Sequence, residues 1–174
     1  MTHLVDILLG KKTIPAYLPA LKYGRETEPE GKRQVIAMLR SQGHKNIKGH
    51  DCGLYVFSDM PYLGASPDLV VECQCCGFNV CEIKCPLSKV TNSDYLVSST
   101  GQVTLKTGHQ YHTQMMGQMA ATNIYQGYFY VHLDEPVLCK VHFDPVKWKS
   151  VVHNLHIFFE NWLADALVKE YGSK

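Results

Sequence analysis

Apolar and polar positions along the chain follow two different periods, and the changes of period divide it into helices and strands. Apolar residues recur at helical spacing in three segments, which predicts helices at 23–42, 109–123 and 145–171. Short runs rich in β-branched and aromatic residues predict strands at 53–58, 68–72, 79–84, 125–133 and 137–143. The polar, turn-rich stretch 87–108 carries one small hairpin around Gly101. Helices therefore precede, interrupt and follow the strands.

This order favours an α/β (α+β) fold in which helices cover one central mixed sheet. The strands at 68–72 and 79–84 flank a turn at Gly77, so we expect them to be antiparallel neighbours. We predict a single domain over 1–174, with a shortened or truncated N-terminal segment at 1–22, a core at 23–143 and an amphipathic helix at 145–171. The buried stripe of that helix is expected to comprise Val152, Leu155, Phe159, Trp162, Leu163 and Ala166.

Composition changes this picture little, because 45% apolar and 19% charged residues are ordinary for a globular domain. The net charge of +1 gives no general basic excess, so any nucleic-acid contact depends on local clusters. No apolar stretch reaches the length of a membrane span, and the N-terminus lacks the features of a secretory signal. Seven cysteines, four of them crowded into 73–81, suit a reducing compartment. We expect an intracellular protein of the nucleus or cytoplasm, without membrane association.

Two carboxylates and a lysine form the candidate site. Asp68 opens one strand, and Glu82 and Lys84 lie on the next. Because strand side chains alternate between faces, Glu82 and Lys84 share one face while Cys81 and Ile83 point toward the core. If the strands pair, Asp68 and Glu82 converge at one edge of the sheet. Together with a backbone carbonyl they offer the oxygen ligands that Mg²⁺ prefers. Taken alone, the three residues are better explained as an exposed ion pair on a solvated strand.

Two helices carry further candidates. Tyr111, Gln114 and Gln118 fall near one helix face, which alone indicates no more than a solvated polar stripe. Glu28 lies among Glu26 and Glu30, where acids also suit the start of a helix. The sequence pattern does not choose among these three acids. The methionines at 115, 116 and 119 are expected to fill the core.

A family resemblance connects these residues. The segment Gly64-Ala65-Ser66-Pro67-Asp68, followed by Glu82-Ile83-Lys84, is similar to the PD-(D/E)xK nucleases of the lambda exonuclease type, the YqaJ viral recombinase family. Residues 23–29 resemble the family's Gly-x-x-x-Glu-Pro helix, which makes Glu28 a further active-site acid. Residues 111–114 resemble its Tyr-x-x-Gln helix, which assigns Gln114 to the site. The four motifs follow the family's order.

The resemblance implies a Mg²⁺-dependent DNA nuclease, with Mn²⁺ as a substitute metal, acting as a 5′→3′ exonuclease on duplex ends in recombination. It implies that the metal is held by Asp68, Glu82 and the backbone carbonyl of Ile83. The implied catalytic residues are Glu28, Asp68, Glu82, Lys84 and Gln114. A homo-oligomer and a recombination or single-strand annealing partner protein are further expectations.

Two departures limit this analogy. No helix before Tyr23 matches the one with which the family binds a 5′-phosphate through an Arg and a Ser, and Leu69 replaces a Gly. These departures concern exonuclease action at a DNA end and leave the metal-binding residues intact. Candidates for DNA contacts, each of which is also explicable as solvated surface, are Arg25, Ser66, Lys89, Lys106, His109 and Tyr111.

The cysteine-rich turn is a separate feature. Cys73 and Cys76 have the two-residue gap of a zinc site, which Cys52, Cys81 or His50 would have to complete. Reduced thiols are the favoured interpretation. The alternatives to a nuclease are a non-catalytic DNA-binding domain and a zinc-hairpin interaction domain of a recombination or transposition system.

Overall fold

The computed structural model describes residues 2–13, 15, 17–88, 94–99 and 101–172. The chain divides into two compact units, one formed by Pro19–Asp144 and the other by Met1–Leu18 with Pro145–Lys174. Among the described residues, no helix has the length and apolar character needed to cross a membrane.

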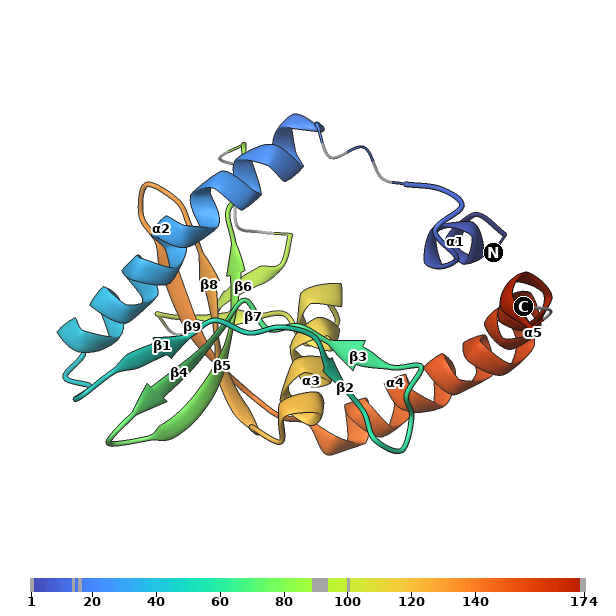
Figure 1. Cartoon of the computed structure of the whole chain (residues 1–174). Coiled ribbons are helices and arrows are strands. Elements are labelled where there is room, and N and C mark those ends of the chain that lie inside the picture. The colour runs from blue at the N-terminus through green and yellow to red at the C-terminus, as the bar shows by residue number, and fades with distance from the viewer. Residues whose placement is uncertain (1, 14, 16, 89–93, 100, 173–174) are drawn as a thin grey trace. The chain divides into compact units, whose positions relative to one another are not determined.

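A mixed sheet forms the centre of the 19–144 unit (Figure 1). Within the described residues its order is β1 (Lys48–His50), β4 (Leu69–Cys73), β5 (Gly77–Lys84), β8 (Gln126–Val131) and β9 (Val137–His142). Neighbours are antiparallel except for β5 and β8, which are parallel. The predicted pairing of β4 with β5 and the predicted α+β fold are confirmed. The sequence prediction missed β1, whose three residues are all exposed.

Two short hairpin-like pairs accompany the sheet. β2 (Tyr55–Val56) pairs with β3 (Gly64–Ala65), so only two residues of the strand predicted at 53–58 form. β6 (Leu96–Ser99) pairs with β7 (Gln102–Leu105) through a turn at Gly101, as predicted.

Helices α2 (Pro19–Ser41) and α3 (Gln110–Thr122) pack on the sheet. Val35 and Leu39 of α2 lie in one apolar cluster with Cys81 and Ile83 of β5. Gln114 and Gln118 of α3 instead contact Glu82, which alternates with Cys81 and Ile83 along the strand. Met115, Met116 and Met119 of α3 are fully buried, as expected for core residues. Glu82 therefore lies on the α3 side of the strand, and Cys81 and Ile83 lie on the α2 side.

The close approach of α2 to β5 depends on Gly31. A Cβ atom at this position would lie 2.8 Å from Ile83 Cγ2 and 3.4 Å from a ring carbon of Tyr130. We expect Gly31→Val to lower the free energy of unfolding by about 2 kcal/mol, because overpacking forces the helix away from the strand. Chemical denaturation measures this change.

Gly24→Ala is the matched control on the same helix. A Cβ there meets only the carbonyl oxygen of Cys85 at 4.0 Å, so the higher helix propensity of Ala should leave stability unchanged or raise it by up to about 1 kcal/mol. Equal effects of the two substitutions would contradict the packing assigned to Gly31.

In the other unit, the predicted C-terminal helix forms as α4 (Pro145–Phe158), a π-helical turn η1 (Phe159–Leu163) and α5 (Ala164–Tyr171). The expectation of a buried stripe is wrong: none of the described residues of these elements is buried, and Trp162 is 49% exposed. The other helix described in this unit is the short α1 (Thr2–Leu8). Lys11 and Glu170 form an ion pair at 2.6 Å within this unit.

Candidate active site

A cavity of about 430 Å³ opens in the 19–144 unit where α2, α3 and the ends of β4 and β5 meet. It brings together the predicted acids Glu28, Asp68 and Glu82 with Lys84 and Gln114. Its further lining is Ala20, Leu21, Gly24, Arg25, Ile83, Cys85, Pro86, Tyr95 and Tyr111. Residues from four separate sequence motifs thus line the same cavity.

The register of β4 and β5 places two carboxylates side by side. Leu69 is opposite Cys81, so Asp68 immediately before the strand lies next to Glu82. The backbone N–H of Ile83 donates to Asp68 Oδ2 at 2.7 Å. Burial and the neighbouring Glu82 carboxylate raise the pKa of Asp68 to about 7, although the Ile83 N–H and the Lys84 ammonium act in the opposite direction. Asp68 is therefore a largely buried carboxyl that lies next to a second buried carboxylate.

Glu82 is only 1% exposed, and polar donors surround its carboxylate. Lys84 Nζ donates to Oε1, which also accepts from Gln114 Nε2 at 2.7 Å. Gln118 Nε2 donates to Oε2 at 2.5 Å. A carboxylate has about four lone-pair positions, so three donors leave capacity for one more ligand.

Gln118 is the contact residue that the sequence analysis did not assign to the site. Its Nε2 also donates to the backbone carbonyl of Ser66, which joins α3 to the segment before Asp68. The available signal was the spacing of four residues from Gln114, which puts both amides on one face of the helix.

We expect Gln118→Leu to reduce stability by about 2 kcal/mol, because it removes a donor from a buried carboxylate. Since groups that orient a metal-binding carboxylate typically affect activity 10- to 100-fold, any metal-dependent activity should fall by roughly that factor. Thermal unfolding and initial rates measure the two effects. Gln110→Leu, at an exposed position of the same helix, is the control. Indistinguishable behaviour of the two variants would contradict the role assigned to Gln118.

Lys84 is held over an aromatic ring. Its Nζ lies 4.5 Å from the centroid of Tyr111, and it also donates to Gln114 Oε1 at 3.4 Å. The Tyr111 ring contacts Tyr95 at 5.4 Å and Phe129 at 5.7 Å between centroids. This packing restrains Tyr111, and the ring then limits the positions that the ammonium can adopt.

The structure distinguishes Glu28 from its neighbouring acids by position. Glu28 lines the cavity, and its Oε1 lies 3.0 Å from Lys32 Nζ. Glu26 pairs with Lys22 on the exposed side of α2, and Glu30 pairs with Arg33. Neither is part of the cavity lining.

The proposed DNA contacts are divided between several places. Arg25 and Tyr111 line the cavity. Ser66 donates its hydroxyl to the carbonyl of Gly53 and is not part of the lining. Lys89 lies outside the described residues.

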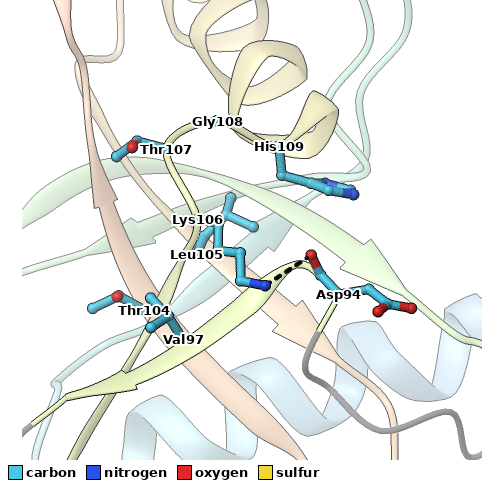
Figure 2. A pocket seen from close by; sticks show the side chains of 8 residues that line it. All are labelled: Asp94, Val97, Thr104, Leu105, Lys106, Thr107, Gly108 and His109. Carbon is cyan, nitrogen blue, oxygen red and sulfur yellow. Dashed lines mark hydrogen bonds between the residues drawn. The ribbon is translucent and has the colours of Figure 1, made fainter.

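Lys106 and His109 lie in a second cavity of about 500 Å³, shown in Figure 2. Lys106 Nζ donates to the carbonyl of Asp94 at 3.2 Å (Figure 2). His109 caps α3, because its Nδ1 accepts from the Tyr111 N–H at 3.2 Å. This contact explains His109 as a helix-start residue.

The residues next to Cys73 and Cys76 in the cysteine-rich turn are not the ones that the sequence predicted. Cys73 and Cys76 are near one another, but the predicted completing residues are elsewhere: His50 bonds to Glu72, Cys81 is buried in the core and Cys52 donates to the His50 carbonyl. His44 and Cys75 occupy the remaining positions of the cluster instead. The register of β1 with β4 causes the difference, since it places His50 opposite Val70, away from the turn.

The oxygen donors in the first cavity fit a hard divalent cation. Asp68 and Glu82 are adjacent carboxylates, and the pKa of Asp68 is raised first by burial and then by the Glu82 carboxylate. A bound cation would favour the ionised form of each. Asp68, Glu82 and the carbonyl of Ile83 are the groups that would hold it, and Glu28 supplies another acid in the same cavity.

A mixed sheet with an acid before one strand, Glu-x-Lys on the next and helices on the sheet defines the restriction-endonuclease-like core of the PD-(D/E)xK class. The model of the YqaJ-like viral recombinase domain matches residues 11–125, more than half of the chain. The protein belongs to this family.

Solved structures share the fold. The chain is similar to LHK-Exo, an alkaline exonuclease from Laribacter hongkongensis, with a TM-score of 0.71 and 20% identity over 99% of this chain and 82% of that one. The same enzyme in complex with dAMP gives a TM-score of 0.67 and 22% identity, covering 99% and 84% of the two chains. No curated protein matches the chain.

Proposed function

We propose that this protein is a Mg²⁺-dependent DNA nuclease that hydrolyses phosphodiester bonds during recombination. The observation that carries the proposal is the meeting of Asp68, Glu82 and Lys84 in one cavity, with Glu28 and Gln114 beside them. Membership of the YqaJ-like viral recombinase family and the shared fold with an alkaline exonuclease support it. Mn²⁺ has the same ligand preference and is expected to substitute.

The contacts of each side chain in the cavity indicate its role in the proposed reaction. Bound Mg²⁺ would supply an acidified water and neutralise charge on the scissile phosphate. Gln114 and Gln118 fix the orientation of Glu82 through separate carboxylate oxygens. The Ile83 N–H fixes Asp68 in the same way. Lys84 places a compact positive charge at the cavity, where it can stabilise the developing charge on a phosphate oxygen.

We further propose that the enzyme acts as a 5′→3′ exonuclease on duplex ends. Support comes from the resemblance of its motifs to the lambda exonuclease type and from the fold shared with an exonuclease solved with dAMP. Arg25, which lines the cavity, is the proposed contact for a DNA phosphate. We also propose a homo-oligomer and a recombination or single-strand annealing partner protein. The seven free cysteines suit a reducing compartment, the nucleus or cytoplasm.

A digestion series on end-labelled DNA tests this proposal. Linear duplexes with a 5′-phosphate or a 5′-hydroxyl and covalently closed circles are incubated with Mg²⁺ or without added metal. We expect Mg²⁺-dependent release of nucleotides from the 5′-strand of linear DNA and no loss of the closed circle. Cutting of the circle would replace the exonuclease proposal by an endonuclease, and release from the 3′-strand would reverse the proposed polarity.

A further inference from the structure

A cysteine and histidine cluster lies at the tip of the β4–β5 hairpin, apart from the first cavity. Its members are His44, Cys73, Cys75 and Cys76, and their ligand atoms all lie within 4.8 Å of one another. His44 Nδ1 is 3.2 Å from Cys75 Sγ, 3.4 Å from Cys73 Sγ and 3.6 Å from Cys76 Sγ. The nuclease chemistry uses none of these residues.

We propose that these four side chains bind one structural Zn²⁺ ion. Three thiolates and an imidazole form one of the usual closed ligand sets for zinc. Bond lengths of about 2.3 Å to sulfur and about 2.0 Å to nitrogen at tetrahedral angles separate two sulfurs by about 3.8 Å, and a sulfur from a nitrogen by about 3.5 Å. The three distances from His44 Nδ1 are close to this value. Cys73 and Cys75, at 3.0 Å between sulfurs, need to separate by less than an ångström.

The backbone brings the ligands to one point independently of any metal. Helix α2 ends in a Schellman motif: the His44 N–H donates to the Leu39 carbonyl at 3.1 Å and the Gly43 N–H to Arg40 at 3.0 Å. Gly43 adopts the positive φ of 87° that this motif requires. His44 is therefore fixed at the end of α2 rather than carried on a mobile loop.

The hairpin supplies the three thiols in a similarly fixed arrangement. Cys73 ends β4, and Gly77 turns the chain into β5 with a φ of 72°. The Gln74 N–H donates to the Lys45 carbonyl at 3.1 Å, which ties the turn to the segment after α2. Gln126 of β8 donates to the carbonyl of Cys76 at 2.7 Å and restrains the opposite side of the turn.

The chemistry of the surroundings favours a metal over a disulfide or an inert thiol group. All three cysteines are free, and Cys75 is exposed whereas Cys73 is buried. Buried Asn79 donates to Cys76 Sγ at 3.5 Å, a contact typical of the donors that orient metal-bound thiolates. A zinc ion here would join the end of α2 to the β4–β5 hairpin. Glu28 lies on α2, Glu82 lies on β5 and Asp68 immediately precedes β4, so the ion would fix the framework of the active site.

Metal analysis of the purified full chain tests the proposal directly. We expect about one zinc per chain by atomic emission, and stoichiometric release when a mercurial reagent titrates the thiols. Protein in which Co²⁺ replaces the zinc should show the intense visible bands of tetrahedral thiolate coordination. Both measurements use the unaltered protein, so they do not depend on a variant that folds.

Matched substitutions locate the ion. Cys75→Ser and His44→Ala should each lose most of the zinc and lower the melting temperature by about 5–10 °C. Cys52→Ser and His50→Ala, outside the cluster, should retain both, and Asp68→Asn should also retain zinc because the cavity carboxylates are a separate site. A zinc content near zero with all thiols titrating as free would overturn the proposal. Loss of zinc in Asp68→Asn with retention in Cys75→Ser would overturn it as well. Neither result depends on whether the protein cleaves DNA.

Discussion

Replacing Lys84 by Ala is expected to reduce DNA cleavage by about 10³-fold while the protein remains folded. Preorganised positive charge at the site where charge develops in a transition state commonly contributes a factor of this size. Lys84 is 24% exposed and lies between Glu82, Gln114 and the Tyr111 ring. Among the described residues, no other lysine lines the cavity, so no second ammonium group is available to replace it. Single-turnover rates on a linear duplex measure the loss.

Loss of the Lys84–Glu82 contact also affects folding, because Glu82 is buried. We expect a decrease of about 1–2 kcal/mol in the free energy of unfolding, moderated by the two glutamines that still bind the carboxylate. Lys84→Gln, which retains donors and length but not charge, should be similarly inactive and more stable than Lys84→Ala. Lys140→Ala, at an exposed position of β9, is the control and should be fully active. Activity within tenfold of the unaltered protein in both Lys84 variants would refute its role.

Asp68→Asn should abolish cleavage and yet stabilise the protein in Mg²⁺-free buffer at pH 8. The pKa of Asp68 is raised to about 7, mainly by burial and then by Glu82. The folded state therefore binds a proton that the unfolded chain releases near pH 4, and stability falls as the pH rises from about 4 to about 7. Asn carries no charge and avoids this loss. We expect the free energy of unfolding to rise by roughly 2 kcal/mol, which is about half the value for a fully buried carboxyl with the same pKa shift.

The pH dependence distinguishes this effect from ordinary changes in packing. The stabilities of Asp68→Asn and the unaltered protein should converge below about pH 3, where the carboxyl is neutral in both the folded and the unfolded state, and be furthest apart above pH 7. Added Mg²⁺ should raise the melting temperature of the unaltered protein but not that of Asp68→Asn. Asp51→Asn is the control, because Lys32 lowers the pKa of this exposed carboxyl. A variant at Asp68 that is less stable than the unaltered protein at pH 8 would contradict the electrostatic account.

The strands that position the site could be predicted because their pattern has a period of two. Alternation correctly assigned Cys81 and Ile83 to the core and put Glu82 beside Lys84. The turn at Gly77 made the β4–β5 pairing predictable, and the pairing then placed Asp68 next to Glu82. Local rules were sufficient in each case, since the contacts lie between elements adjacent in sequence.

Contacts between distant elements could not be predicted in this way. Gln118 reaches Glu82 only because α3 packs on one face of the sheet, and periodicity does not specify the rotation of a helix about its axis. His44 lies beside the cysteine turn because the C-terminal end of α2 is close to the tip of the β4–β5 hairpin. The spacing of the cysteines in the sequence identified only Cys73 and Cys76. The polar strand β1 was missed because its residues Lys48–His50 carry no apolar pattern.

We propose above all that Asp68, Glu82 and Lys84 form a metal-dependent phosphodiesterase site. Cleavage of a linear duplex as a function of Mg²⁺ concentration, by the unaltered protein and by Asp68→Asn purified in parallel, tests it most directly. We predict a rate that rises with Mg²⁺ to saturation and is negligible without it, and no cleavage by Asp68→Asn at any Mg²⁺ concentration. Cleavage that persists without divalent metal, or equal rates for the two proteins, would contradict the claim.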